Sequence, residues 1–304
     1  MEILSRPWEA HHVMTTGLAR AILERRFPDV RLDGLRHLGS GWEFDAYLSP
    51  GGWVFRLPRR PEGARELARE PPVLDLVRPV LAPDVAVPRP ELFAHPGPDF
   101  PYPVVGHRLV EGVGADHPDV PEHPALPAQL GATLGRLHAV STDRARDAGV
   151  DVDPDGVRAW DREMREVLDE LRGTSPVADA ALNRLPDEEE VPADYAGPLR
   201  FIHNDLCPDH VLVRRDTGEL SGLIDWTDAA LADPALDFVF PVTWRGWGFT
   251  EDLLASYGPT LDGGFVPRLR HLARVLSLVW LHEALERGVD ERKHLGWVEN
   301  AFAR

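Results

Sequence analysis

Apolar and polar positions along this chain follow two different periods, and the change between them divides the sequence in two. Residues 35–59 contain short apolar runs typical of strands on both sides of Pro50-Gly51-Gly52, which predicts strand, turn, strand. Elsewhere the apolar residues recur at the spacing of an amphipathic helix. The helices expected on this basis cover residues 9–26, 126–140, 157–172 and 269–286. The pattern therefore predicts an α+β protein.

A proline-rich stretch follows the first strands and marks the end of the first part. It holds two short apolar pieces, residues 85–87 and 92–93, which are typical of edge strands. A further strand is expected over residues 102–110. We therefore predict an N-terminal part over residues 1–111 and a C-terminal part over residues 112–304. A length of 304 residues with 43% hydrophobic residues suits two parts with cores of their own.

The segment from His203 to Asp237 carries the chemistry of the chain. Within it, residues 211–213 and 220–224 are apolar runs of strand type, joined by a turn that contains Asp216-Thr217-Gly218. A hairpin returns the chain to its starting point, so the residues that flank it, His210 and Asp225, should be neighbours in space. Asp205 lies on the same loop as His210.

Two acids held on one rigid scaffold suit phosphoryl transfer. This reaction needs one carboxylate to orient a hydroxyl and another to hold Mg²⁺ on the phosphates, because positioning and charge neutralisation do nearly all of the catalysis. Taken singly, a histidine near an aspartate is usually structural and two such acids are usually solvated. The ordered combination of loop, hairpin, Asp-Trp and Asp-Pro-x-x-Asp is far more specific than any single short motif.

These residues resemble the catalytic loop and the metal-binding aspartate of the protein-kinase-like fold, in the variant of aminoglycoside and macrolide phosphotransferases. The resemblance extends over residues 35–257 and implies a two-lobed α+β fold, with a small antiparallel-sheet N-lobe and a larger, mostly helical C-lobe. It implies Asp205 as catalytic base, Asp225 as principal Mg²⁺ ligand and His210 in the place of the usual metal-binding Asn. An imidazole suits softer metals better than Mg²⁺.

A candidate phosphate-binding turn lies within the first strands. Backbone N–H groups at Gly39, Ser40 and Gly41 could approach a phosphate closely, although an ordinary bend is an equal alternative. The sequence has no G-x-x-x-x-G-K-[ST], which excludes a P-loop. The resemblance implies that Leu109 marks the strand whose backbone groups meet the nucleotide base. ATP and GTP cannot be distinguished by such contacts.

Two further nucleotide-binding residues follow from the resemblance. Arg56 matches the kinase lysine that grips the phosphates, and Glu70 matches the helix glutamate that pairs with it. Arginine keeps the charge but presents a planar fork instead of a point charge. Pro71 and Pro72 follow at once and predict that the helix kinks or ends there.

The C-terminal eighty residues are where such a protein would build its acceptor site. Asp228, Asp237 and Glu283 could receive ammonium groups, whereas Trp244 could line an apolar site. The alternative is that the tryptophans are core and the acids surface. For Asp237 a structural role is favoured, in which it and Asp233 open a helix as N-terminal caps.

Several functions remain open at this point. The expected activity is transfer of the γ-phosphate of ATP or GTP to a hydroxyl of an antibiotic, with an aminoglycoside before a macrolide. Metabolic kinases acting on small molecules share the same motifs. A nucleotide-binding pseudokinase is the non-enzyme alternative, motivated by Arg56, by His210 and by the two prolines after Glu70.

Composition limits the kinds of molecule that this protein is expected to bind. The formal net charge of −17 disfavours nucleic acid and favours cationic small molecules. The single cysteine, Cys207, excludes an internal disulfide and is interpreted as a filler of its loop. No apolar run of about eighteen residues and no signal peptide is present, so we expect no membrane association and a cytoplasmic location. We also expect a monomer. His138, on the expected helix over residues 126–140, is interpreted as a core histidine.

Overall fold

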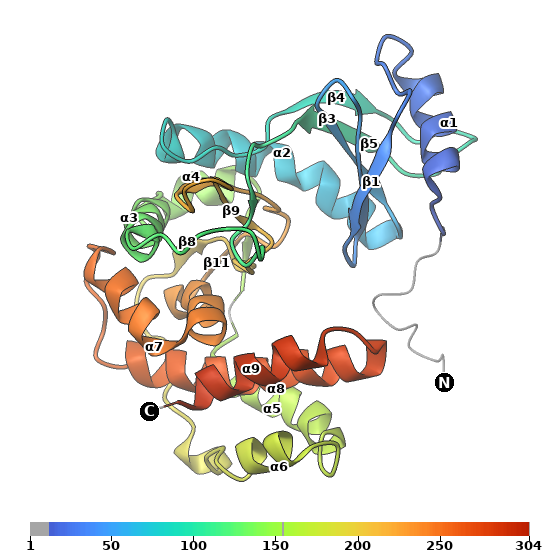
Figure 1. Cartoon of the computed structure of the whole chain (residues 1–304). Coiled ribbons are helices and arrows are strands. Elements are labelled where there is room, and N and C mark those ends of the chain that lie inside the picture. The colour runs from blue at the N-terminus through green and yellow to red at the C-terminus, as the bar shows by residue number, and fades with distance from the viewer. Residues whose placement is uncertain (1–11, 154, 304) are drawn as a thin grey trace.

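The structure is a computed structural model that describes residues 12–153 and 155–303, and it has the two expected lobes (Figure 1). The N-terminal lobe is a five-stranded antiparallel sheet in the order β1-β2-β3-β5-β4, with helices α1 and α2 beside it. Its elements are α1 (Thr16–Arg26), β1 (Arg36–Ser40), β2 (Phe44–Leu48), β3 (Trp53–Pro58), α2 (Pro61–Leu81), β4 (Pro90–Ala94) and β5 (Val104–Arg108). Residues 9–11 of the first predicted helix lie outside the described residues.

The small lobe has a hydrophobic core of its own. Ala19, Ile22 and Leu23 of α1 pack with Tyr47 of β2 and Phe55 of β3, and all five are buried. This burial holds α1 against the sheet, because burying a large apolar side chain stabilises a fold by roughly 1.5–3 kcal/mol. The sheet is therefore a firm support for the residues that β3 carries.

Helix α2 continues through Pro71 and Pro72 to Leu81, so the alternative that the prolines end the helix there is wrong. Val73, Leu74 and neighbouring residues after the prolines are buried in the core of the large lobe. The proline ring removes one hydrogen bond of the helix and disfavours helical geometry at the preceding residue. Burial of the face on both sides of the prolines outweighs that local cost.

The C-terminal lobe is mostly helical, and its helices gather at the end of the molecule opposite the small sheet (Figure 1). Its helices are α3 (Leu126–Leu137), α4 (Thr142–Asp147), α5 (Val157–Glu170), α6 (Pro176–Leu182), α7 (Val239–Ala255), α8 (Phe265–Arg287) and α9 (Glu291–Phe302), with 3₁₀ turns η1 (Glu188–Glu190) and η2 (Pro234–Phe238). Helix α7 bends at Gly246, whose φ of 80° only glycine adopts without strain. None of the described helices is both long and apolar enough to cross a membrane.

Two three-stranded sheets lie between the lobes' helices and carry the loops of interest. Their orders are β10-β9-β6 and β7-β11-β8. The strands are β6 (Val113–Gly114), β7 (Asp151–Val152), β8 (Arg200–Ile202), β9 (Val211–Val213), β10 (Leu220–Leu223) and β11 (Ala230–Ala232). The predicted hairpin is confirmed, with Leu223 paired to Val211 and the Ile224 N–H donating to the His210 carbonyl at 3.1 Å.

The piece at residues 85–87 is not an edge strand of the small sheet. Ala86 instead makes a single bridge to Gly222 of β10, with the Ala86 N–H on the Ser221 carbonyl and the Leu223 N–H on the Ala86 carbonyl. This short segment therefore joins the end of α2 to the β9–β10 hairpin of the large lobe. Helix α2 carries Glu70, and Asp225 follows the hairpin, so the segment connects the elements that position these two residues.

Candidate active site

The loop between β8 and β9 is held by a buried carboxylate. Asp237 accepts the backbone N–H of His203 at 3.0 Å and that of Asn204 at 2.7 Å, and it lies 2.9 Å from His138 Nε2. Its side chain has no exposed surface. Asp237 is therefore an anchor of the loop rather than a group that receives an acceptor's ammonium, and the predicted acceptor role of this residue is wrong. Asp233, in contrast, caps η2 as expected, through the Ala235 N–H.

His138 completes this anchor from helix α3. Its other ring nitrogen, Nδ1, lies 2.6 Å from the Tyr257 hydroxyl, so both nitrogens have a partner in the core. The prediction of a satisfied core histidine is confirmed. Sequence reasoning missed Tyr257, and no local signal points to it, because the tyrosine lies 119 positions further along the chain.

Two residues of the site adopt left-handed backbone geometry. Asn204 has a φ of 69° and Asp225 a φ of 61°, values that few residues other than glycine adopt. Asparagine and aspartate tolerate this region best among the others, and such strain persists only where the surroundings impose it. Here the Asp237 carboxylate imposes it on the loop before Asp205, and β10 and Trp226 flank Asp225.

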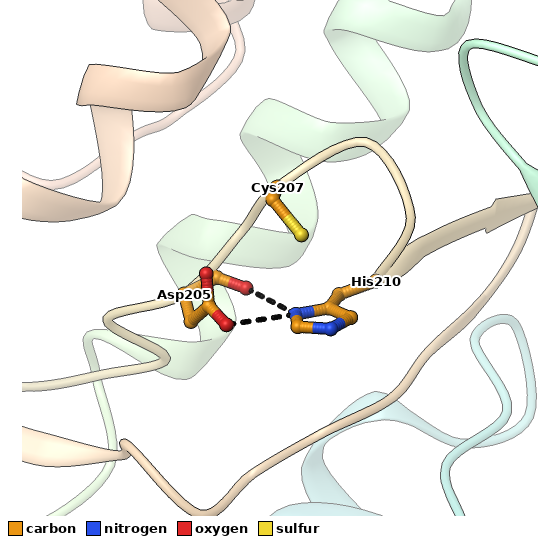
Figure 2. A group of neighbouring side chains, drawn as sticks. All are labelled: Asp205, Cys207 and His210. Carbon is orange, nitrogen blue, oxygen red and sulfur yellow. Dashed lines mark hydrogen bonds and ion pairs between the residues drawn. The ribbon is translucent and has the colours of Figure 1, made fainter. Parts of the chain in front are cut away.

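His210 lies between the two predicted catalytic acids. Its Nδ1 is 2.9 Å from the backbone oxygen and 3.1 Å from the carboxylate of Asp205 (Figure 2), whereas its Nε2 is 3.7 Å from Oδ2 of Asp225. The hairpin thus brings together the three residues as the sequence predicted. Burial alone would lower the pKa of His210, but Cys207 and the Asp205 carboxylate outweigh it and raise that pKa well above its usual value.

Arg56 joins the small lobe to this group. Its guanidinium donates to Glu70 at 2.6 Å and to Asp225 at 2.8 Å, and it stacks on the Phe44 ring with 4.1 Å to the ring centroid. Burial opposes the charge on Arg56, but Asp225 and Glu70 outweigh it and raise its pKa. Burial likewise opposes the charge on Asp225, yet Arg56 and then His210 lower the pKa of that carboxyl. Arg56 and Glu70 therefore form the expected pair, with Phe44 as an unforeseen support.

The glycine-containing turn is compact. Ser40 ends β1 and its hydroxyl donates to Asp45 at 2.5 Å, while the Gly41 N–H donates to the Phe44 carbonyl at 2.9 Å. The N–H of Gly41 is thus used within the turn, which leaves Gly39 as the glycine whose surroundings are open. These contacts agree with an ordinary bend, and the phosphate-binding role of the turn stays a prediction.

The backbone N–H of Leu109 is also occupied. It donates to the Gly52 carbonyl at 2.9 Å, as a continuation of the pairing between β3 and β5. The expectation that backbone groups near Leu109 meet a nucleotide base therefore stays a prediction, which rests on the other N–H and C=O groups of this strand.

Two acids near Asp225 have raised pKa values, and one of them, Asp228, also lies near Asp205. Burial, followed by the charges of Asp205 and Asp225, raises the pKa of Asp228 to about 6, although its side chain is still open to solvent. Burial, followed by the charges of Glu43 and Asp228, raises the pKa of Glu66 to about 7. Sequence reasoning missed Glu66, which sits one helical turn before Glu70 on α2. The spacing of four was the signal that could have found it.

The remaining acceptor candidates lie on the C-terminal helices. The Trp244 ring packs against Phe249, with 5.6 Å between centroids, beneath the Arg245 guanidinium. Burial raises the pKa of Glu283 on α8 to about 7. In the described part of the chain, no hydrogen bond or ring contact joins Trp244 or Glu283 to Asp205.

An aromatic cluster was not predicted as such. The rings of Phe240 from α7 and Trp280 from α8 stack with 4.1 Å between centroids, and Trp297 from α9 meets both edge-on. Phe240 and Trp280 keep part of their surface exposed, so this cluster is a candidate apolar surface on the C-terminal helices.

Cys207 is enclosed in the same loop. Burial raises the pKa of its thiol, which argues against a role as nucleophile. The interpretation of Cys207 as a residue without a covalent role agrees with this environment.

The fold and the site define the protein-kinase-like class of enzymes. Their features are a small antiparallel sheet, a helix ion-paired to it through Arg56, and a loop and hairpin that carry Asp205 and Asp225. Residues 34–271 match the model of the phosphotransferase enzyme family, and the chain belongs to that family. It is an enzyme of the small-molecule kinase type.

Two curated relatives match part of the chain. The Uncharacterized protein YcbJ of Bacillus subtilis (strain 168) is 30% identical over 216 residues, 67% of each protein. The homoserine kinase of Beijerinckia indica subsp. indica is 34% identical over 159 residues, which are 52% of this chain and 46% of that kinase. The second match thus spans less than half of its relative.

Solved structures are similar over nearly the whole chain. The GDP and kanamycin complex of APH(2")-IIia is 26% identical with a TM-score of 0.69, and the match covers 93% of this chain and 95% of that one. The apoenzyme of macrolide 2'-phosphotransferase MphH from Brachybacterium faecium is 25% identical with a TM-score of 0.61, over 93% and 98% of the two chains. Both resemble this chain in fold and in the order of its lobes.

Proposed function

We propose that this enzyme transfers the γ-phosphate of ATP or GTP, with Mg²⁺, to a hydroxyl of an aminoglycoside antibiotic and thereby gives resistance. The observation that carries the proposal is one connected set of polar contacts across the lobes. Glu70 pairs with Arg56, Arg56 pairs with Asp225, and His210 lies between Asp225 and Asp205. Such a set provides the separate carboxylates and the buried cation that phosphoryl transfer requires.

The donor set around Asp225 fits Mg²⁺, which prefers one or two carboxylates together with phosphate and water oxygens. Asp225 keeps its charge because Arg56 and His210 lower its pKa, and the carboxyl groups of Asp228 and Glu66 lie nearby. Asp225 would hold the ion with His210 beside it. Bound there, Mg²⁺ would neutralise charge on the phosphate oxygens.

Each residue of the set has its own task in the proposed reaction. Asp205 orients the acceptor hydroxyl and takes its proton, and Asp237 holds the loop that aims Asp205. Arg56 is the buried cation that pairs with phosphate oxygens, and Glu70 and Phe44 keep its guanidinium in place. The turn at Gly39, Ser40 and Gly41 and the backbone near Leu109 would enclose the nucleotide.

An aminoglycoside suits the acidic surroundings of Asp205. The chain carries a net charge of −17, Asp228 lies near the predicted base, and Glu66 lies near Asp225 and Asp228. Charged hydrogen bonds contribute roughly 1.5–3 kcal/mol each, so a few acids suffice for about micromolar binding. The kanamycin complex of a related fold supports the same choice.

Two alternatives have an observation of their own. The aromatic cluster of Phe240, Trp280 and Trp297, with Trp244 on the same helix as Phe240, would favour a macrolide. The match with a homoserine kinase would favour a metabolic hydroxyl acceptor instead. Glu283 lies one helical turn from Trp280 and could serve either an ammonium group or a single macrolide amine.

An acceptor screen with ATP and GTP in parallel tests the proposal. Kanamycin and other aminoglycosides, several macrolides and homoserine are offered to the wild-type enzyme and to Asp205→Asn, and nucleoside diphosphate release and phosphorylated product are both measured. Phosphorylation of an aminoglycoside by the wild-type enzyme alone is expected. Turnover of macrolides only would make a macrolide the acceptor, and turnover of homoserine only would make the enzyme a metabolic kinase. Nucleotide binding without turnover of any acceptor would favour a pseudokinase.

A further inference from the structure

The loop that carries the predicted base also gathers three side chains that bind softer metals. Asp205, Cys207 and His210 each offer a ligand atom, and these three atoms lie within 4.8 Å of one another. Figure 2 shows the Cys207 sulfur pointing into the space between the Asp205 carboxylate and the His210 ring. All three side chains are partly accessible to solvent, so an ion can reach them.

We propose that Asp205, Cys207 and His210 form a binding site for Zn²⁺ or a similarly soft divalent cation. Carboxylate, thiolate and imidazole are the three ligand types that proteins use for zinc, and three protein ligands with a water in the fourth position are a common arrangement. Tetrahedral zinc would draw the ligand atoms to roughly 3.3–3.7 Å from one another, a closure that the side-chain rotations of one short loop supply.

The two ring nitrogens of His210 face different partners. A metal-bound imidazole almost always donates its second ring N–H to a carboxylate or carbonyl, which fixes its orientation. Here Nδ1 faces Asp205 and Cys207, and Nε2 faces the carboxylate of Asp225 at 3.7 Å. Zinc on Nδ1 therefore leaves the ring proton on Nε2, directed at Asp225.

Protons and charge balance in this step. Zinc bonds to the Cys207 sulfur while the S–H bond breaks, and the thiol proton is released to solvent. Zinc on Nδ1 requires that this nitrogen carry no proton, so a ring that is protonated on both nitrogens also releases one proton and keeps the other on Nε2. No oxidant or reductant is needed, and zinc binding releases protons that a weakly buffered solution reports.

This site differs in chemistry from the one proposed for Mg²⁺. Magnesium avoids sulfur ligands, whereas thiolates select zinc and related metals. Zinc on the Asp205 carboxylate would occupy the group that accepts the acceptor's proton, so zinc would inhibit phosphoryl transfer. This consequence, unlike the binding itself, rests on the function proposed above.

The test of binding uses the full chain without a polyhistidine tag. Co²⁺ replaces Zn²⁺ as a spectroscopic probe, and Zn²⁺ affinity is measured by competition with a chromophoric chelator. Wild-type protein is expected to show a near-ultraviolet thiolate-to-cobalt absorption band. Cys207→Ser should lose the band and bind Zn²⁺ weaker by on the order of a hundredfold, since even a supporting contact is worth 10–100-fold.

A matched pair of histidine variants keeps the test specific. His210→Asn is expected to weaken Zn²⁺ binding as Cys207→Ser does, whereas His95→Asn, at an exposed histidine on the small lobe, should leave it unchanged. Circular dichroism of each variant excludes loss of folding as the reason. A wild-type Co²⁺ complex without the thiolate band, or equal Zn²⁺ affinity of wild type and Cys207→Ser, overturns the site.

Activity separates this inference from the proposed function. With an accepted substrate, Zn²⁺ should inhibit the wild-type enzyme at concentrations that leave Cys207→Ser active, at saturating Mg²⁺ and nucleotide. If no acceptor is turned over, the proposed function fails while the spectroscopic result still decides the zinc site. Equal inhibition of both proteins would show that zinc acts elsewhere, and it would contradict the inhibitory role.

Discussion

Asp205 and Asp225 are carboxylates of one polar set, but their surroundings prepare them for different tasks. Asp225 is tied to Arg56 and Thr227, which keeps its charge fixed in place. The Asp205 side chain meets the imidazole of His210 through one carboxylate oxygen, and we propose that its other oxygen serves a reacting hydroxyl. Both are aimed by neighbouring backbone in left-handed geometry, at Asn204 and at Asp225 itself.

The task assigned to Asp205 is tested by Asp205→Asn. Loss of a positioned base should lower kcat by on the order of a hundred- to ten-thousand-fold, while nucleotide binding and thermal stability stay near those of wild type. Steady-state kinetics with nucleotide-binding calorimetry measure both. A variant that turns over at nearly the wild-type rate would remove Asp205 from the role of base.

The task assigned to Asp225 is tested by contrast with His210. Asp225→Ala should abolish Mg²⁺-dependent nucleotide binding, because it removes the carboxylate that the ion requires. His210→Asn should retain most of the activity, since an amide oxygen also suits Mg²⁺. Calorimetric titrations of nucleotide with and without Mg²⁺ compare the two. A Mg²⁺ response of Asp225→Ala equal to that of wild type would place the ion elsewhere.

Asp228 provides a test of the acidic surroundings through pH. A carboxyl whose pKa rises on folding binds more protons when folded, so the fold loses stability as pH rises from its usual pKa through about 6. Asp228→Asn should therefore raise the melting temperature near pH 8, with a smaller gain near pH 5. Because the side chain is exposed, the gain should stay below about 1 kcal/mol.

Thermal melts without Mg²⁺ or nucleotide make this comparison, since a bound cation would change the pKa. Asp216→Asn, at an exposed position in the turn of the β9–β10 hairpin, serves as the matched control and should show no such pH trend. A gain for Asp228→Asn that is constant between the two pH values would contradict the raised pKa.

At the scale of elements, helix α2 shows packing prevailing over local preference. Glu70 immediately precedes Pro71 and Pro72, yet it stays helical, is buried and pairs with Arg56. Its carboxylate also accepts the Trp226 N–H at 3.2 Å, next to Asp225. The helix is thus fixed from both lobes at the point where its own sequence favours an interruption.

The free-energy cost of a proline inside helix α2 can be measured at Pro72, which is exposed. Pro72→Ala restores an N–H that can reach the carbonyl of Ala68, and removing a proline from a helix interior contributes up to about 3 kcal/mol. The freer unfolded chain offsets about 0.4–1 kcal/mol of this gain. The free energy of unfolding from urea titration should therefore increase, with kcat unchanged. A decrease would mean that the proline ring itself stabilises the helix.

At the scale of the whole molecule, the excess of acidic residues acts at long range. A net charge of −17 attracts cations over distances comparable to the Debye length, about 10 Å at 0.1 M salt. The effect grows with the charge of the acceptor. It therefore distinguishes aminoglycosides, with three to five amines, from macrolides, with one.

Salt dependence of KM tests this attraction. For an aminoglycoside acceptor, KM should rise severalfold between about 0.05 M and 0.5 M salt, with a much smaller change in kcat, because screening weakens capture and not chemistry. A macrolide measured alongside is the control with a single charge. An aminoglycoside KM that does not respond to salt would confine the recognition to short-range contacts.

The sequence alone determined the α+β class, the two lobes, the β9–β10 hairpin and the order of Asp205, His210 and Asp225. These features depend on short-range patterns, namely the period of apolar residues, turn chemistry and the return of a hairpin, which neighbours in sequence impose on one another. The pairing of Arg56 with Glu70 was expected from the resemblance to kinase-like phosphotransferases, and the structure shows it.

Only the tertiary structure decided the rest. Asp237 is a buried anchor of the loop before Asp205, and helix α2 continues past its prolines. The Leu109 N–H donates to the Gly52 carbonyl, and Cys207 lies beside His210. Each of these outcomes depends on burial and on partners far along the chain, such as His138 for Asp237. Burial changes the energy of a polar group by more than any local preference does, and burial exists only once the chain has folded.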